Sequence, residues 1–129
     1  MKTLFTFLIS VSLLIACSQG NAQENLTVKE LNAIEFNKED NKVVLDVRTA
    51  QEYTEGRIAG SENLDVLKTD LFTTSIAKLD KSKTYYVICR SGSRSQKAVA
   101  QMKEAGFKNI YNITGGMQAW EAANFAVEK

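Results

Sequence analysis

The strongest constraint on the fold is an alternation of strand-like and helix-like segments along the chain. Two short runs rich in β-branched and aromatic residues, 42–47 (KVVLDV) and 84–89 (TYYVIC), have the composition of buried strands. The second run is the more apolar, which is typical of a central strand covered on both faces. Residues 109–113 form a third such run. Strands separated by helical segments predict an α/β fold, with a mostly parallel sheet between two layers of helices.

Apolar residues recur at helical spacing between and around these strands. The helices are predicted over residues 28–34, 67–79, 98–105 and 117–123. A short additional helix is predicted after Thr49, because Thr49 and Glu52 have the spacing of a capping box. The last helix follows Gly115 and Gly116, and we interpret these glycines and Trp120 mainly as packing residues.

The amino-terminal segment differs in composition from the rest of the chain. Lys2 is followed by an uncharged apolar stretch that ends in the sequence LIAC at Cys17. This pattern resembles a bacterial lipoprotein signal, so residues 1–16 are predicted to be removed and Cys17 to be lipidated. An ordinary signal peptide cleaved at residues 20–22 (GNA) is the alternative. Both alternatives predict an exported protein of the bacterial cell envelope.

The remainder of the chain is long enough for one domain. Residues 17–25 are small and polar and are predicted to form a tether, and residues 26–129 are predicted to form the domain. The chain has 16 basic and 15 acidic residues, and removing Lys2 with the signal leaves 15 of each. Because no basic stripe exists, we expect no nucleic-acid partner, and contact with the membrane through the lipid anchor only.

The residue types that are missing narrow the chemistry. The chain has no histidine, which is the commonest general base and metal ligand. Its two cysteines, Cys17 and Cys89, cannot form a C-x-x-C motif, a zinc ribbon or an iron–sulfur site. We therefore expect no metal and no cofactor. Any reaction must use cysteine, serine, arginine and carboxylate side chains.

The candidate site lies at residues 89–95 (CRSGSRS), between the second strand-like run and the next helix. Cys89 closes the strand at the carboxyl edge of the sheet, which is where α/β proteins bind ligands. Ser93 and Gln96 have the spacing of a capping box, so the helix is predicted to begin beside Cys89. The free N–H groups of a helix amino terminus form an anion site.

The residues that follow Cys89 favour a reactive thiolate. Gly92 permits a tight turn, and Arg90 and Arg94 add fixed positive charge. Together with the helix amino terminus, they are expected to lower the pKa of the Cys89 thiol, so that no histidine is needed. The alternative is a cysteine that packs as a small apolar residue. Two arginines and a glycine directly after it fit a core poorly.

Four motifs in this order resemble the rhodanese-like family, over about residues 38–125. The site sequence CRSGSRS is similar to the family pattern C-x-x-G-x-R-S. Residues 45–48 (LDVR) resemble its D-V-R strand end, and residues 52–63 resemble its E-[FY]-x-x-G-H-I-x-G-A-x-N segment. Residues 115–120 (GGMQAW) resemble its G-G-x-x-A-W. Two positions depart from the family, Arg57 for the usual histidine and Ser61 for the usual alanine.

The resemblance implies a rhodanese-like three-layer fold and sulfur transfer. The Cys89 thiolate would take sulfur from an anionic donor such as thiosulfate, hold it as a persulfide and pass it to a thiol or to cyanide. Asp46 and Arg48 would brace the active-site side of the sheet, with a surface ion pair of little energy as the alternative. The substrate-binding residues would be Arg90, Ser91, Gly92, Ser93, Arg94 and Ser95.

Three function classes stay open at this point: a sulfurtransferase, an arsenate reductase or phosphatase on the same scaffold, and a non-catalytic binding module of the envelope. An inactive module is expected to have lost Cys89 or the arginines, and this chain keeps them. Cys89 and Arg94 have C-x₄-R spacing, which resembles the sulfur-handling members of the family. The longer C-x₅-R loop marks relatives that handle phosphate or arsenate, because one more residue widens the ring of donors.

Overall fold

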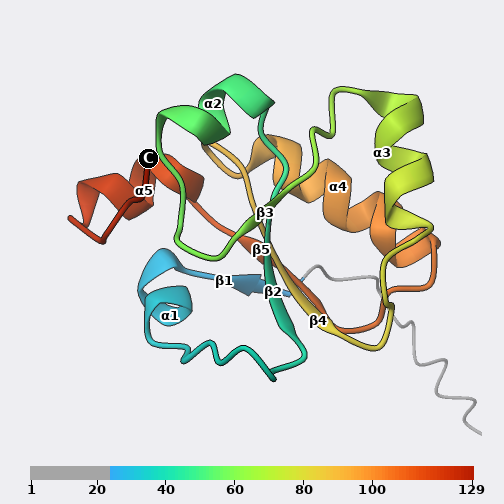
Figure 1. Ribbon diagram of the computed structural model, residues 1–129, viewed down its shortest axis with the longest axis horizontal. Coiled ribbons are helices and arrows are strands. Elements are labelled where there is room, and N and C mark those ends of the chain that lie inside the picture. The colour runs from blue at the N-terminus through green and yellow to red at the C-terminus, as the bar shows by residue number, and fades with distance from the viewer. Residues whose placement is uncertain (1–23) are drawn as a thin grey trace, which may run out of the picture.

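A parallel β-sheet forms the centre of the computed structural model, which describes residues 24–129 (Figure 1). All strand pairings in the sheet are parallel, and the strand order is β1-β5-β4-β2-β3. The strands are β1 (Asn25–Leu26), β2 (Lys42–Asp46), β3 (Glu62–Asn63), β4 (Thr84–Ile88) and β5 (Ile110–Ile113). The prediction of a central β4 is confirmed, and the sheet is parallel throughout.

Helices cover both faces of the sheet, so the predicted three-layer α/β architecture is confirmed (Figure 1). Side chains of α3 and α4 pack on one face, and those of α1 and α5 pack on the other. Helix α2 buries no residue completely. The helices are α1 (Val28–Asn32), α2 (Ala50–Glu55), α3 (Thr69–Ile76), α4 (Ser93–Glu104) and α5 (Gly116–Ala122).

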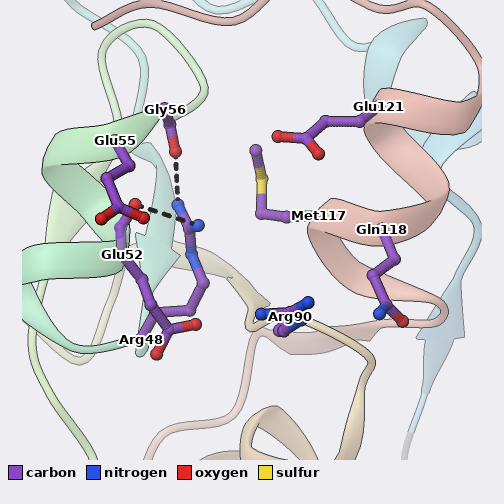
Figure 2. A pocket seen from close by; sticks show the side chains of 8 residues that line it. All are labelled: Arg48, Glu52, Glu55, Gly56, Arg90, Met117, Gln118 and Glu121. Atoms are coloured by element: carbon purple, nitrogen blue, oxygen red, sulfur yellow. Dashed lines mark hydrogen bonds between the residues drawn. The ribbon is translucent and has the colours of Figure 1, made fainter.

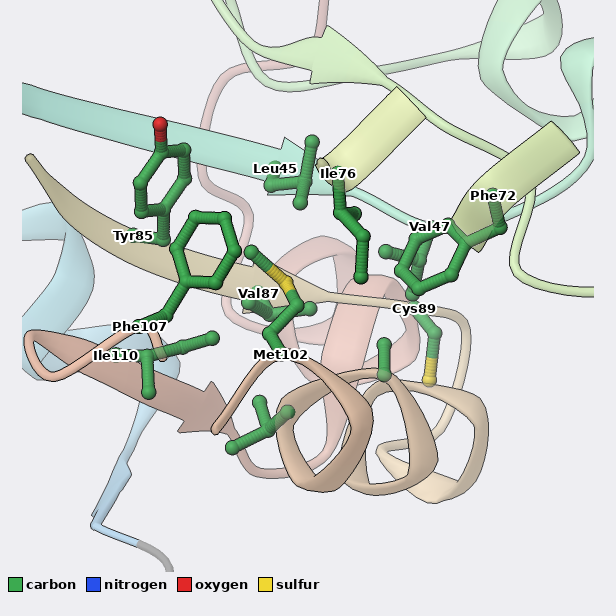
Figure 3. Close-up of a cluster of buried hydrophobic side chains, with 12 residues drawn as sticks. Leu45, Val47, Phe72, Ile76, Tyr85, Val87, Cys89, Met102, Phe107 and Ile110 are labelled. Atoms are coloured by element: carbon green, nitrogen blue, oxygen red, sulfur yellow. The ribbon is translucent and has the colours of Figure 1, made fainter. Parts of the chain in front are cut away.

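The larger apolar cluster lies between the sheet and helices α3 and α4 (Figure 3). Leu45 and Val87 from the sheet meet Phe72 of α3 and Met102 of α4 there, and each is at most 2% exposed. Cys89 belongs to the same cluster. The catalytic candidate therefore stands at the boundary between the apolar core and the carboxyl edge of the sheet.

The two shortest strands were not predicted. Strand β1 begins at Asn25, which pairs with Asn112 of β5, so the sheet starts one residue inside the segment predicted as a tether. A two-residue strand is too short to show a periodicity. The predicted signal peptide and Cys17 lie outside the described residues. Within residues 24–129, no helix is long and apolar enough to cross a membrane.

Candidate active site

The thiol of Cys89 lies at the start of α4, at the carboxyl end of β4 (Figure 3). The residue is 1% exposed. The Gly92 N–H donates a hydrogen bond to Sγ at 3.1 Å, and Ser95 Oγ lies 3.3 Å from Sγ. Ser95 is itself fully buried, and its hydroxyl donates to the Gly92 carbonyl at 3.0 Å. The sulfur is therefore surrounded by polar groups of its own loop.

These contacts set the charge state of the sulfur. Burial raises the pKa of the Cys89 thiol, but its hydrogen bonds with the Ser95 hydroxyl and with the N–H groups of Ser95, Gly92 and Ser91 lower it. The hydrogen bonds prevail, so the pKa lies below that of an ordinary thiol. The predicted lowering thus arises mainly in the backbone and hydroxyl cradle rather than in the arginine side chains.

The predicted capping box at Ser93 and Gln96 is wrong. Helix α4 begins at Ser93, its N-cap is Gly92, and no side chain caps it. Gly92 has φ 101°, a left-handed conformation that glycine adopts without a steric penalty. This conformation accompanies the hydrogen bond from the Gly92 N–H to Cys89. The loop geometry is thus centred on the sulfur rather than on a serine cap.

Arg94 is held by a carboxylate that the sequence analysis did not assign to the site. Its Nη1 and Nη2 atoms donate to the two carboxylate oxygens of Glu52, at 2.8 and 2.9 Å. The hydrogen bonds from Arg94 lower the pKa of Glu52 to about 2. The pKa of Arg94 is raised, first by Glu52 and with smaller contributions from Cys89 and Asp65. Arg94 therefore ties α4 to α2 and stays within electrostatic reach of the thiol.

From the sequence alone, Glu52 is interpreted through its spacing from Thr49 and as the first residue of the family-like segment 52–63, without a role in the site. The capping half of that prediction is confirmed, since Thr49 Oγ1 accepts a hydrogen bond from the Glu52 N–H at 3.2 Å. The Glu52 carboxylate instead accepts from the Thr49 hydroxyl at 3.1 Å and from Arg94. The Glu52–Arg94 pair spans 42 residues of sequence, so no local pattern could reveal it.

Arg90 differs from Arg94. Its side chain is exposed and makes no hydrogen bond or ion pair with any residue from 24 to 129. Its carbonyl accepts a hydrogen bond from the N–H of Gln118 in α5 at 2.9 Å. The backbone of Arg90 is therefore fixed, while its guanidinium is available to an anion.

Asp46 and Arg48 form a buried pair, so the surface ion pair considered for them is wrong. Asp46 is 0% and Arg48 6% exposed. Arg48 Nη2 donates to Asp46 at 2.7 Å and to the Gly56 carbonyl at the end of α2, also at 2.7 Å. The amide of Asn63 donates to the carbonyls of Asp46 and Arg48, at 3.0 and 2.9 Å. These contacts support a bracing role, because they join β2, β3 and α2 beside the loop.

The first turn of α5 holds the active-site loop from the other side. The Met117 N–H donates to the Cys89 carbonyl at 2.8 Å, next to the bond from Gln118 to Arg90. Gly116 has φ 54°, and a Cβ placed on it would lie 2.6 Å from the carbonyl carbon of Arg90. The pair of glycines thus lets the helix approach the loop backbone. Trp120 packs in the core cluster with α1, as predicted.

A cavity of about 180 Å³ lies between α2 and α5 and ends at Arg90 (Figure 2). The cavity offers charged groups of both signs beside the loop. Cys89 does not line it. Its lining residues are Arg48, Glu52, Glu55, Gly56, Arg90, Met117, Gln118 and Glu121.

The two positions that depart from the family pattern make contacts away from the thiol. The guanidinium of Arg57 lies 5.1 Å from the centre of the Tyr53 ring, and its backbone pairs with Glu128. The Ser61 hydroxyl donates to the Ile58 carbonyl at 2.6 Å. Both contacts order the connection between α2 and β3.

The fold is a parallel sheet between helices, and a loop that begins with a cysteine lies at its carboxyl edge between α2 and α5. This arrangement is typical of enzymes that use a cysteine thiolate as the nucleophile. Comparison with protein families agrees, since residues 27–123 match the Rhodanese-like domain. The chain belongs to the rhodanese-like family, and it is a sulfurtransferase-type enzyme.

Known proteins show how far the likeness extends. The thiosulfate sulfurtransferase GlpE of Pseudomonas putida (strain GB-1) is 36% identical over 90 residues, which cover 70% of this chain and 79% of that protein. A rhodanese-related protein from Thermoplasma volcanium superposes with a TM-score of 0.68 at 30% identity, over 81% of this chain and 97% of that one. A Rhodopseudomonas palustris protein named "Possible Tyrosine Phosphatase" superposes with a TM-score of 0.69 at 25% identity, over 82% and 85% of the two chains.

Proposed function

We propose that this protein transfers sulfane sulfur from an anionic donor, thiosulfate or another persulfide or polysulfide, through a persulfide on Cys89. The observation that carries the proposal is the environment of Sγ, where a hydroxyl and backbone N–H groups outweigh burial and lower the thiol pKa. Groups that stabilise a thiolate also stabilise the terminal anionic sulfur of a persulfide. They are preorganised, so no rearrangement is needed when the charge moves outward by one atom.

The first step is a displacement at sulfur. The Cys89 thiolate attacks the outer sulfur of thiosulfate, an S–S bond forms to Cys89, and the S–S bond within thiosulfate breaks. Sulfite leaves with the electron pair, so the total charge is unchanged and no external oxidant is needed. We assign the binding of the anionic donor to the guanidinium of Arg90, because it has no ion-pair partner among residues 24–129 whereas Arg94 is already bound to Glu52.

The second step returns the enzyme to its starting state. The acceptor, cyanide or a thiolate, attacks the outer sulfur of the persulfide, and Cys89 leaves as a thiolate. Hydrogen bonds that lower the thiol pKa make Cys89 a better leaving group as well. The same cradle therefore serves both half-reactions, and the mechanism requires no histidine.

Loop length supports sulfur chemistry over the oxyanion alternative. Cys89 to Arg94 spans six residues, and Gly92 and Ser95 already direct their polar groups at Sγ, at 3.1 and 3.3 Å. A cradle that contacts a single sulfur in this way suits a persulfide, whereas a tetrahedral oxyanion needs donors for three or four oxygens. A misplacement near 1 Å costs on the order of 10²-fold in rate.

Intact mass spectrometry tests the proposal directly. The protein is incubated with thiosulfate, and its mass is expected to rise by one sulfur atom and to return when cyanide is added. Cys89→Ser should show neither change. The same preparation is offered an aryl phosphate and arsenate. A protein that never gains sulfur, or that hydrolyses the phosphate or reduces arsenate faster than it transfers sulfur, would contradict the proposal.

A further inference from the structure

The cavity between α2 and α5 has an uneven balance of charge. Two of its charged residues already have partners outside it, since Arg48 pairs with Asp46 and Glu52 pairs with Arg94. Arg90, Glu55 and Glu121 remain, and none of the three has an ion-pair partner among residues 24–129. The cavity therefore presents one guanidinium and two carboxylates without an ion-pair partner, and Glu55 in addition accepts a hydrogen bond from Gln51 Nε2 at 3.4 Å.

The opposite charges occupy different parts of this cavity. Arg90 lies at the end next to the active-site loop, and Glu121 projects from α5 toward α2 (Figure 2). A Cβ placed on Gly56 would lie 3.9 Å from Glu121 Oε1, so this carboxylate reaches the end of α2. Glu55 lines the α2 side. The carboxylates thus stand across the cavity from the guanidinium.

The size of the cavity limits the ligand. A volume of about 180 Å³ has room for a small molecule and is too small for a folded partner. The side chain of Met117 projects between Arg90 and Glu121 and supplies an apolar wall (Figure 2). The cavity suits a small ligand with separate charges at its two ends.

We propose that this cavity is the acceptor site, and that it binds a small thiol carrying one carboxylate and one ammonium group. The acceptor carboxylate pairs with Arg90, and its ammonium pairs with Glu121 and Glu55. Because Arg90 follows Cys89 directly, a carboxylate bound there holds the acceptor beside the active-site loop. This inference rests on the proposed function and names the class of acceptor.

The transfer step balances without a further reagent. The acceptor thiolate attacks the outer sulfur of the Cys89 persulfide, a new S–S bond forms, and the bond to Cys89 breaks with its electron pair on Cys89. The products are the acceptor persulfide and the Cys89 thiolate. The same two carboxylates repel a dianionic donor such as thiosulfate. They therefore favour binding of the acceptor and disfavour binding of the donor.

Three thiols that differ by one charged group test this assignment. Persulfide-loaded protein is discharged with cysteine, with cysteamine, which lacks the carboxylate, and with 3-mercaptopropionate, which lacks the ammonium. The acceptor persulfide is trapped by alkylation and measured by mass spectrometry. Each thiol is compared between wild type and variant, so its intrinsic reactivity cancels.

Glu121→Gln is expected to slow discharge by cysteine and cysteamine about fivefold and not to slow discharge by 3-mercaptopropionate. The same variant should accelerate loading by thiosulfate. Glu55→Gln should act in the same directions. Glu104→Gln removes an exposed carboxylate at the far end of α4 and should change none of these rates. An equal effect on all three thiols, or no effect, would overturn the assignment.

Binding without chemistry separates this inference from the proposed function. If wild-type protein never loads sulfur, the proposed function fails, and the cavity is tested with the unreactive thioether S-methylcysteine. Amide resonances of Arg90, Gln118 and Glu121 should shift on titration, and 3-(methylthio)propionate should shift them more weakly. Glu121→Gln should remove that preference. An absence of shifts at these residues would overturn the inference, whatever the outcome of loading.

Discussion

At the scale of single residues, the two arginines of the loop have different environments. Arg94 donates two hydrogen bonds to Glu52, whereas the Arg90 side chain is exposed and has no partner within the described chain. From their positions in the sequence, both arginines were predicted to bind the substrate and to lower the pKa of the Cys89 thiol. The difference depends on a carboxylate from another helix, and it separates an arginine that holds the structure together from one that can bind a substrate.

Arg90→Gln is expected to weaken the donor half-reaction. Removing an unpaired guanidinium should raise the KM for thiosulfate about tenfold, because a charged hydrogen bond to an anion is lost. The free energy of unfolding should stay within roughly 0.5 kcal/mol of wild type, since an exposed side chain without partners is removed. Steady-state kinetics and urea unfolding measure the two effects. An unchanged KM would contradict the role given to Arg90.

Ser95→Ala is expected to raise the pKa of the Cys89 thiol. The hydrogen bond with its hydroxyl is the largest contribution that lowers this pKa, so removing the hydroxyl should move the pKa back toward that of an ordinary thiol. The thiolate is the reactive form, so the alkylation rate rises with pH, and its midpoint should lie higher in the variant. Iodoacetamide alkylation followed across pH measures that midpoint.

Ser93→Ala is the matched control for this measurement. Ser93 lies in the same loop, but its side chain is exposed and its hydroxyl makes no hydrogen bond to Sγ. Its midpoint should equal that of wild type. Equal midpoints for all three proteins would contradict the assignment of the pKa shift to Ser95.

At the scale of secondary-structure elements, the active-site loop is held between α2 and α5. Gly116→Ala should separate α5 from the loop, because its Cβ would meet backbone atoms of Cys89 and Arg90, which cannot rotate away. We expect a loss of about 3 kcal/mol in the free energy of unfolding and slower alkylation of Cys89. Urea unfolding and alkylation kinetics check both.

Gly60→Ala controls for backbone conformation in that comparison. Gly60 also has a positive φ, 76°, but a Cβ there would meet nothing within 4 Å. Its cost should be about 1 kcal/mol, from the left-handed conformation alone. If the two variants are equally destabilised, steric contact of α5 with the loop is not the cause.

Glu52→Gln should uncouple α2 from α4 in a pH-dependent way. The pKa of Glu52 falls from 4.5 to about 2 on folding, mainly through Arg94. A depressed carboxyl pKa stabilises the fold above pH 4.5, and this contribution is lost as the pH falls toward 2. Because water screens this partly exposed pair, we expect a loss of roughly 1 kcal/mol at pH 7, less than the pKa shift alone implies, and a smaller difference near pH 2.5. Urea unfolding at pH 7 and at pH 2.5 measures the difference in free energy of unfolding between wild type and variant. An equal difference at the two pH values would contradict the ion pair between Glu52 and Arg94.

Elements with a long repeating pattern were predicted well from the sequence. The runs that became β2, β4 and β5 and the spacing that became α3 and α4 each carry several apolar residues in phase. The two-residue strands β1 and β3 carry no such signal. The start of α4 was right, but its cap was wrong because Gly92 is oriented by Cys89 rather than by a serine. Contacts distant in sequence, such as Glu52 with Arg94, cannot be inferred from local spacing.

At the scale of the whole molecule, the parallel sheet separates the amino-terminal entry from the active site. All strands point the same way, so the chain enters at the amino end of β1, at Asn25, whereas Cys89 follows the carboxyl end of β4. Residues 18–24 can span roughly 25 Å when fully extended. An attachment at Cys17 would therefore join the domain at the edge of the sheet opposite the active site.

We propose that the mature chain is anchored through a lipidated Cys17, and Cys17→Ala tests this. One acyl chain binds a bilayer only marginally, so firm attachment needs several chains on the same residue. Wild-type protein is expected in the membrane fraction and the variant in the soluble fraction, with detergent releasing the wild type. Thiosulfate loading of Cys89 should be equal in the two proteins, since the described chain begins at the edge of the sheet opposite Cys89. If both proteins fractionate alike, the ordinary signal peptide cleaved at residues 20–22 accounts for the amino-terminal segment instead.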